Sequence, residues 1–192
     1  MKTPARVMEF LVMKSSRQQR SLLLLRHGKS SWDNSALADI DRPLALRGIA
    51  AATAMGGEMA RSGLVPDRIL CSPARRASDT LRLVAASFPQ DISPETIEGL
   101  YDFGDGSALL EIIQRHGGKS HRLMLVGHNP ALQQLALRLG GPGDPAQRQA
   151  IARKFPTTAL AILDFELEDW AELADGKGGI ARFIRPRDVL KK

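Results

Sequence analysis

The chain has 192 residues and a mass of 20.9 kDa, a size that fits one compact domain. Its residues are 43% hydrophobic and 25% charged, which is typical of a globular protein and excludes a disordered or fibrous chain. No apolar run approaches the ~20 residues that a membrane helix needs, so we expect no membrane partner. With one cysteine, Cys71, the chain can form no internal disulfide, and we expect a cytoplasmic protein.

Lysine and arginine together number 27, against 21 aspartates and glutamates, which gives a net charge of +6. Such a surplus is compatible with nucleic acid binding. However, the cations are scattered along the chain, and no zinc-finger or RNA-binding motif accompanies them. We therefore expect no nucleic acid partner. A small anionic group such as phosphate accounts for the same surplus.

Residues 1–20 differ from the rest of the chain. They are basic, with Glu9 as their only acid, and that glutamate interrupts their apolar residues. A signal peptide needs an uninterrupted apolar stretch and a cleavage site with small residues. The sequence therefore predicts an N-terminal extension over residues 1–20 and a single domain over residues 21–192.

From residue 21 onward, short apolar runs alternate with segments of helical periodicity. Strands are predicted at residues 22–25, 68–71, 123–126, 159–165 and 180–184. Helices are predicted at residues 46–61, 74–88, 107–115 and 130–139, and turns at residues 140–145 and 175–179. Strands that alternate with helices predict an α/β domain of three layers, in which helices cover both faces of a mostly parallel central sheet.

Residues that can do chemistry follow three of these strands. Arg26 and His27 follow the first strand, Ser72 follows the second, and His128 and Asn129 follow the strand at 123–126. Because the carboxyl ends of parallel strands meet at one edge of a sheet, we expect these residues to converge on one pocket. Ser72 and Asn129 are the residue types that cap helices, and we expect them to cap the helices that follow.

Two arginines lie where a helix disfavours cations. Arg75 and Arg76 fall in the first turn of the predicted helix 74–88, and the positive end of the helix dipole favours anions there. A bound phosphate would offset these charges, and helix N-termini present unpaired N–H groups to phosphate. Together with the arginine and histidines at the strand ends, this placement predicts an anion-binding pocket.

Three motifs occur in order along the chain: Leu-Leu-Arg-His-Gly ending at Gly28, Ser-Pro-Ala-Arg-Arg-Ala-Ser-Asp-Thr beginning at Ser72, and Val-Gly-His-Asn-Pro beginning at Val126. Together they resemble the histidine phosphatase superfamily, whose members have the phosphoglycerate-mutase-like fold. Asp-Ile-Asp-Arg-Pro-Leu beginning at Asp39 and Phe-Pro-Thr-Thr beginning at Phe155 are most similar to its small SixA-type phosphohistidine phosphatases. The resemblance covers roughly residues 21–185.

The resemblance implies a role for each matching residue. It makes His27 the nucleophile that accepts the phosphoryl group, Arg26 and Arg76 the clamps on that group, and His128 a further donor. It implies substrate-binding roles for Arg26, Arg42, Arg76, His128 and Asn129. Phosphoryl transfer asks mainly for positioning and neutralisation of the phosphoryl oxygens, and the planar fork of arginine can bind two of them. We expect no metal ion and no cofactor.

The proton donor is left open by the sequence. Larger members of the superfamily carry a glutamate just after the third strand, and here Leu100-Tyr101-Asp102 occupies that neighbourhood, which makes Asp102 one candidate. Asp39 is a second candidate, because SixA-type members carry an acid at that position. With a phosphohistidine substrate a strong general acid is less necessary, since imidazole is a good leaving group, so the donor is Asp102, Asp39 or neither.

The favoured function is a metal-independent phosphatase that forms a phosphohistidine intermediate and removes phosphate from phosphohistidine on a protein. The predicted elements between Arg76 and His128 use up most of that segment, so we expect a shallow pocket without a lid. One alternative is a phosphatase or mutase of small phosphorylated metabolites. Another is a non-catalytic phosphate-binding module.

Overall fold

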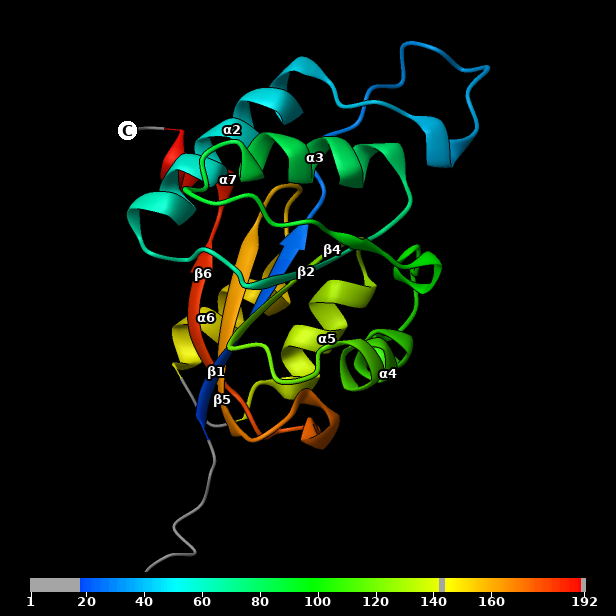
Figure 1. Ribbon diagram of the computed structural model, residues 1–192. Coiled ribbons are helices and arrows are strands. Elements are labelled where there is room, and N and C mark those ends of the chain that lie inside the picture. The colour runs from blue at the N-terminus through cyan, green and yellow to red at the C-terminus, as the bar shows by residue number, and fades with distance from the viewer. Residues whose placement is uncertain (1–17, 142–143, 191–192) are drawn as a thin grey trace, which may run out of the picture.

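The leucine-rich segment after residue 20 forms the centre of the sheet, as its composition predicts. The first strand, β1 (Gln18–Arg26), contains four consecutive leucines, residues 22–25, which are fully buried. A strand that is apolar on both faces needs helices on both faces to bury it. The computed structural model describes residues 18–141 and 144–190 of the chain, and Figure 1 shows β1 between the other strands.

The sheet has six strands in the order β3-β2-β4-β1-β5-β6. The other strands are β2 (Arg68–Cys71), β3 (Glu95–Thr96), β4 (Arg122–Gly127), β5 (Leu160–Leu167) and β6 (Gly179–Ile184). Neighbours from β3 to β1 pair in parallel, whereas β5 is antiparallel to both β1 and β6. The prediction of a mostly parallel sheet is confirmed. Because β5 reverses direction, β6 ends at the same edge of the sheet as β1.

Helices cover both faces of this sheet, so the predicted three layers are confirmed (Figure 1). The helices are α2 (Leu46–Arg61), α3 (Arg75–Ala85), α4 (Ser107–His116), α5 (Ala131–Leu139), α6 (Pro145–Arg153) and α7 (Pro186–Val189). Alternate leucines of β1 serve the two faces. Leu23 and Leu25 join the core beneath α2, α3 and α7, whereas Leu22 and Leu24 join the core beneath α4, α5 and α6.

Helix α6 was not predicted from the sequence, which indicated a turn up to Pro145 and nothing beyond it. Asp144 caps this helix by accepting a hydrogen bond from the Ala146 backbone N–H at 2.8 Å, and Pro145 occupies its first turn. The helix is polar, and Ile151 is its one buried residue, so its apolar periodicity is too weak to detect.

The boundary of the N-terminal extension remains a prediction. Strand β1 begins at Gln18, where it pairs with Leu167 of β5, three residues before the predicted start of the domain. Residues 1–17 lie outside the part of the chain that the structure describes. Within the described residues, no helix combines the length and apolar character required to cross a membrane.

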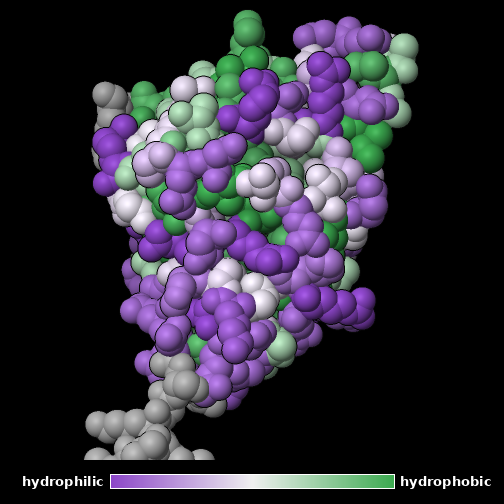
Figure 2. Space-filling view, in the orientation of Figure 1, coloured by the Kyte–Doolittle hydropathy of each residue, from purple (hydrophilic) through white to green (hydrophobic). Residues whose placement is uncertain are grey.

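Large apolar side chains are exposed at few places on the described surface. Figure 2 shows polar side chains over most of the lower half of its view, and more apolar ones in the upper half, around α2 and α3. The exposed large apolar residues are Trp32, Leu46, Ile49, Phe103 and Leu190. Two of them, Trp32 and Phe103, contact residues of the strand-end cluster that forms the candidate active site.

Alanine substitutions at two adjacent glycines of α2 are expected to change the stability of the protein in opposite directions. A Cβ at Gly56 would lie 2.5 Å from the backbone oxygen of Val84 in α3, whereas a Cβ at Gly57 would meet only the flexible end of Arg61, at 3.2 Å. Gly56→Ala should lower the free energy of unfolding by about 1–3 kcal/mol because the helices must separate. Gly57→Ala should raise it by up to about 1 kcal/mol through helix propensity. Urea denaturation measures both, and equal effects of the two substitutions would contradict this packing.

Candidate active site

The three sequence motifs meet at the carboxyl edge of the sheet, as predicted. β1 and β2 both pair with β4, so the residues that follow these strands are neighbours. The backbone N–H of His27 donates to the carbonyl of Gly127 at 3.1 Å, and that of Ser72 donates to the carbonyl of Val126 at 3.0 Å. Hydrogen bonds between backbones therefore fix the starting points of all three motifs.

His27 and His128 form the centre of the site. Their ring centroids lie 4.9 Å apart, and the residues are only 8% and 1% exposed. Nδ1 of His27 lies 2.7 Å from the carbonyl oxygen of Gly28. A carbonyl can only accept a hydrogen bond, so Nδ1 carries the proton and Nε2 keeps its lone pair. This tautomer makes Nε2 the nucleophilic atom of His27.

His128 is oriented by Ser72, whose Oγ lies 2.8 Å from His128 Nε2. A hydroxyl can donate to this nitrogen or accept from it, so Ser72 supports either neutral tautomer of the ring. The other ring nitrogen, Nδ1, lies 3.5 Å from the guanidinium of Arg76. Of the two ring nitrogens, Nδ1 is the one that lies toward the arginines.

Both imidazoles are held neutral. Burial lowers the pKa of His27 to about 4, with further lowering by the charges of Arg76 and Arg26 and partial opposition from the Gly28 carbonyl. Burial lowers the pKa of His128 to about 3, helped by His27 and Arg76. An imidazole must be unprotonated to attack phosphorus, so this environment keeps His27 competent as a nucleophile near neutral pH.

Arg26 and Arg76 act on the histidines through their charges, and Arg42 is linked to Arg76 through Asp39. Arg26 donates to the carbonyl of Phe155 at 2.6 Å, while its buried Nε–H has no hydrogen-bond partner among the described residues. Arg76 is 3% exposed and Arg42 is 6% exposed. Arg42 donates to Ser30 Oγ at 2.7 Å, and the ring of Trp32 lies over its guanidinium at 3.2 Å. The three cations predicted to bind phosphate are therefore together in the structure.

The carboxylate of Asp39 connects two of these arginines. It accepts hydrogen bonds from Arg42 and Arg76 at 2.8 Å each, and from the hydroxyl of Tyr101 at 2.6 Å. Arg76 also donates to the backbone oxygen of Asp39. The Tyr101 hydroxyl, with Arg42 and Arg76, lowers the pKa of Asp39 to about 2. Such a carboxylate holds no proton near neutral pH, so Asp39 is suited to orient arginines and unsuited to act as a general acid.

Asp102, the first candidate for proton donation, lies on its own turn. Its carboxylate accepts the backbone N–H of Gly104 at 3.0 Å, a local contact typical of a turn aspartate. Within the described residues it makes no hydrogen bond to His27, His128 or an arginine of the site. Its role as a proton donor therefore stays a prediction.

The two predicted helix caps are wrong. Helix α3 begins at Arg75 after Ala74, and α5 begins at Ala131 after Pro130, with no side-chain cap at either end. The hydroxyl of Ser72 accepts the N–H of Ala74, one residue before the helix, at 3.3 Å, and it also contacts His128. The amide of Asn129 donates to Gln133 and to the carbonyl of Phe155, the same carbonyl that binds Arg26. The structure thus places Asn129 beside the arginine pocket, with its Oδ1 buried and unpaired among the described residues.

Sequence reasoning gave no supporting role to Thr80 and Thr158. Thr80 is fully buried; its hydroxyl accepts the N–H of Gly28 at 2.8 Å and donates to the carbonyl of Arg76 at 2.6 Å. Thr158 has a φ of 63°, which is rare for a β-branched residue, and its N–H lies 3.0 Å from the carbonyl of Arg26. Such strain often marks a functional site. The only signals were the motif from Ser72 to Thr80 and the Phe-Pro-Thr-Thr motif, which indicated a family and gave these two residues no mechanism.

This geometry defines a class of protein: an α/β phosphoryl-binding protein with a neutral imidazole among arginines at a strand edge. The family model described as histidine phosphatase superfamily (branch 1) matches residues 22–107. An uncharacterised protein of Mycobacterium tuberculosis is 35% identical over 85% of this chain and 100% of its own length. The chain belongs to the histidine phosphatase superfamily, which confirms the resemblance seen in its motifs.

Two solved structures share this fold over almost their whole length. A protein assigned as phosphohistidine phosphatase SixA from Nakamurella multipartitia is 26% identical, with a TM-score of 0.74 over 88% of this chain and 97% of that chain. A protein assigned as SixA from Agrobacterium tumefaciens is 28% identical, with a TM-score of 0.69 over 87% and 99% of the two chains. These similarities support a phosphatase with the phosphoglycerate-mutase-like fold.

The lowered pKa values predict that His27 and His128 stay neutral down to about pH 5. NMR spectra of the ring C–H groups of the four histidines, recorded from pH 8 to pH 4, would measure this. The variants His27→Gln and His128→Gln would assign the signals. The unfolded chain protonates first, at its ordinary pKa near 6.5. Stability therefore decreases as pH falls below about 6.5. A titration midpoint of His27 above pH 6 would contradict the buried, cation-rich environment.

Adjacent arginines of α3 provide a matched pair of substitutions. Arg76 is buried against Asp39 and His128, whereas the Arg75 side chain is 57% exposed and pairs with Asp79 at 3.7 Å. Arg76→Ala should lower kcat/KM for p-nitrophenyl phosphate by at least about 100-fold, because a donor to the phosphoryl oxygens is lost. Arg75→Ala should change it by less than about 2-fold. Comparable losses in the two variants would show that Arg76 has no special position.

Proposed function

We propose that this protein removes the phosphoryl group from phosphohistidine on another protein, without a metal ion, through a phosphorylated His27. The observation that carries the proposal is the neutral His27 imidazole, with its Nδ1–H on Gly28 and the charges of Arg26 and Arg76 acting on it. Arginines supply the positive charge that metal ions supply in other phosphoryl-transfer sites.

In the first step, Nε2 of His27 attacks phosphorus and the P–N bond to the substrate imidazole breaks. Positive charge develops on the ring of His27, and the Gly28 carbonyl 2.7 Å from Nδ1 stabilises it. Arg26, Arg42 and Arg76 bind the phosphoryl oxygens. His128 donates a further hydrogen bond from Nδ1 in the tautomer in which Ser72 donates to Nε2, and the phosphoryl oxygen then replaces the Arg76 contact at Nδ1. The leaving imidazole takes up one proton on either ring nitrogen, so solvent can supply it and neither aspartate is required.

In the second step, water attacks the phosphorus on His27. The P–N bond to Nε2 breaks, inorganic phosphate is released, and the proton that water loses leaves with phosphate or solvent. The neutral ring of His27 is restored for the next cycle. Of the three arginines of the site, Arg26 is the one that has no carboxylate partner among the described residues. Its unpaired Nε–H is suited to hold the phosphoryl group through both steps.

The choice of a protein substrate rests on what surrounds the site. Between Arg76 and His128 the chain forms only α3, β3, a short 3-10 helix, α4, β4 and their connections, with no inserted domain. A phosphohistidine on a protein surface can approach such a site, whereas small metabolites gain binding energy from enclosing contacts. The similarity to structures assigned as SixA supports the same substrate class.

The covalent intermediate can be tested directly. Incubation with a ³²P-labelled phosphohistidine peptide in EDTA should label the protein with an acid-labile, base-stable phosphoramidate, because the P–N bond of phosphohistidine has those stabilities. His27→Ala should abolish the label. His121→Ala is the control, because His121 lies at the opposite edge of the sheet, just before β4. Persistence of the label in His27→Ala would overturn the mechanism. So would a label that forms on the wild type without EDTA and fails to form with it.

A substrate panel separates the proposal from the two alternatives. The expected result is a higher kcat/KM for phosphohistidine peptides than for 3-phosphoglycerate and simple sugar phosphates. A clear preference for a small metabolite would contradict the proposed substrate class and would leave the proposed mechanism through His27 in place. Phosphate binding without turnover on any substrate would identify a binding module instead.

A further inference from the structure

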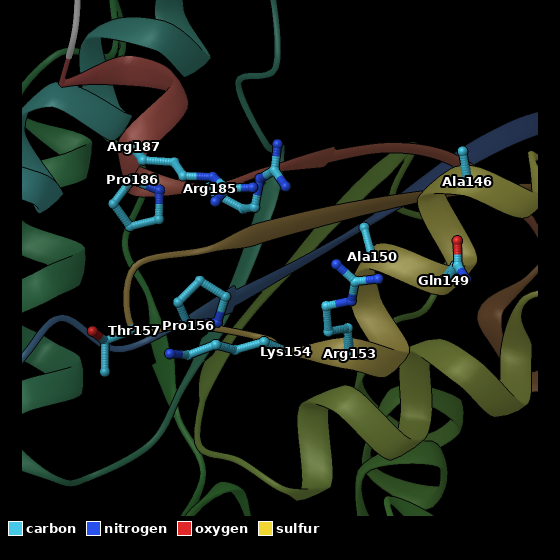
Figure 3. Close-up of a pocket in the computed structure, with 10 residues that line it drawn as sticks. All are labelled: Ala146, Gln149, Ala150, Arg153, Lys154, Pro156, Thr157, Arg185, Pro186 and Arg187. Atoms are coloured by element: carbon cyan, nitrogen blue, oxygen red, sulfur yellow. The ribbon is translucent and has the colours of Figure 1, made fainter.

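A basic cavity of about 550 Å³ lies between the end of α6 and the start of α7 (Figure 3). Its polar and charged lining residues are Gln149, Arg153, Lys154, Thr157, Arg185 and Arg187. Four of these six are cations, and the lining includes no aspartate or glutamate. A cavity of this size with one sign of charge attracts anions.

The topology places this cavity at the edge of the sheet that holds His27. Leu160, the first residue of β5, pairs with Leu25 near the end of β1 and with Ile184 at the end of β6. The residues before β5 and after β6 therefore lie beside the residues that follow β1. Neighbouring strands are about 4.8 Å apart, which puts the end of β6 roughly 10 Å from that of β1.

Two of the four cations lack a counter-charge in the described structure. Arg185 donates to Asp188 at 2.8 Å, and Arg187 approaches the same carboxylate at 3.8 Å. Arg153 and Lys154 are exposed and form no side-chain hydrogen bond or ion pair with any described residue. Their charges are therefore available to a ligand.

One segment of chain joins the cavity to the active site. Lys154 and Thr157 line the cavity, whereas the carbonyl of Phe155 between them accepts a hydrogen bond from Arg26 at 2.6 Å. Thr158, which directly follows Thr157, donates its N–H to the backbone carbonyl of Arg26. A ligand in the cavity is thus held at a fixed distance from the phosphoryl pocket.

We propose that this basic cavity binds carboxylate side chains of the phosphorylated protein while its phosphohistidine lies at His27. The inference rests on the proposed function and names the surface that selects the substrate. A helix rises 1.5 Å per residue, so a carboxylate seven residues from the phosphohistidine on one helix lies about 10 Å away, comparable to the separation of the ends of β1 and β6. The partner is therefore a protein whose phosphorylated histidine has acidic neighbours.

The test uses two phosphohistidine peptides that differ only in three positions, placed three, four and seven residues after the histidine. These are glutamates in one peptide and glutamines in the other. The variant is Arg153→Gln with Lys154→Gln. Its control is Arg115→Gln with Lys119→Gln, which removes the same charges at the end of α4 and in the turn before β4, at the opposite edge of the sheet. All four substituted residues are exposed, so folding should be retained.

The wild type and the control should show a KM about 10-fold lower for the glutamate peptide than for the glutamine peptide, with similar kcat, and salt should weaken this preference. The cavity variant should lose most of the preference, while its hydrolysis of p-nitrophenyl phosphate stays unchanged.

Other outcomes separate the two proposals. If the wild type hydrolyses both peptides equally well, or the cavity variant keeps the preference, the cavity is not the docking site and the proposed function stands. If the cavity variant also loses p-nitrophenyl phosphate hydrolysis, the cavity serves the phosphoryl pocket and the docking proposal is overturned. If the wild type hydrolyses p-nitrophenyl phosphate and neither peptide, the proposed function itself fails.

Discussion

Burial of groups that can carry charge is the constraint on which the site depends. Three guanidinium groups share one strand edge with two imidazoles, and unscreened cations at such separations disfavour each other. The imidazoles lose their protons chiefly because they are buried, and the charges of Arg76 and Arg26 add to this effect. The carboxylate of Asp39 pairs with both Arg42 and Arg76. Arg26 keeps its charge with a carbonyl as its partner. Three arginines against one carboxylate leave the unliganded site with excess positive charge, which attracts an incoming anion.

The contacts that hold the arginines order the site before a substrate arrives. Arg42 is held by Ser30, by the carbonyl of Ser31 and by the ring of Trp32, and Arg76 is held by Asp39. Donors that are already in place need no reorganisation when charge moves onto the phosphoryl oxygens. Backbone hydrogen bonds also order the loop after β1, which carries Arg42. The N–H of Ser31 donates to the carbonyl of Pro43, and the N–H of Ala45 donates to the carbonyl of Lys29.

The sequence could predict those features of the fold and of the site that short stretches of chain determine. The parallel strands and the residues that follow them could be read locally, because each motif directly adjoins an apolar strand. The Asp39 cluster could not, since Asp39 meets Arg76 across 37 positions and Tyr101 across 62. Ser72 looked like a cap because its residue type fits one; its hydroxyl is instead used by His128, a partner 56 positions away. Spacing patterns carry no information about such contacts until the fold is known.

The stacking of Trp32 on Arg42 also gives the protein a built-in optical reporter. The chain has two tryptophans, and their surroundings differ completely. Trp170 is fully buried and donates its indole N–H to Ser120 at 2.9 Å, near the opposite edge of the sheet, so its emission follows the integrity of the core. Trp32 is 69% exposed and lies on an arginine of the phosphate pocket, so its emission senses the charge and position of that guanidinium. A single fluorescence spectrum thus combines emission from a tryptophan in the core with emission from a tryptophan on Arg42.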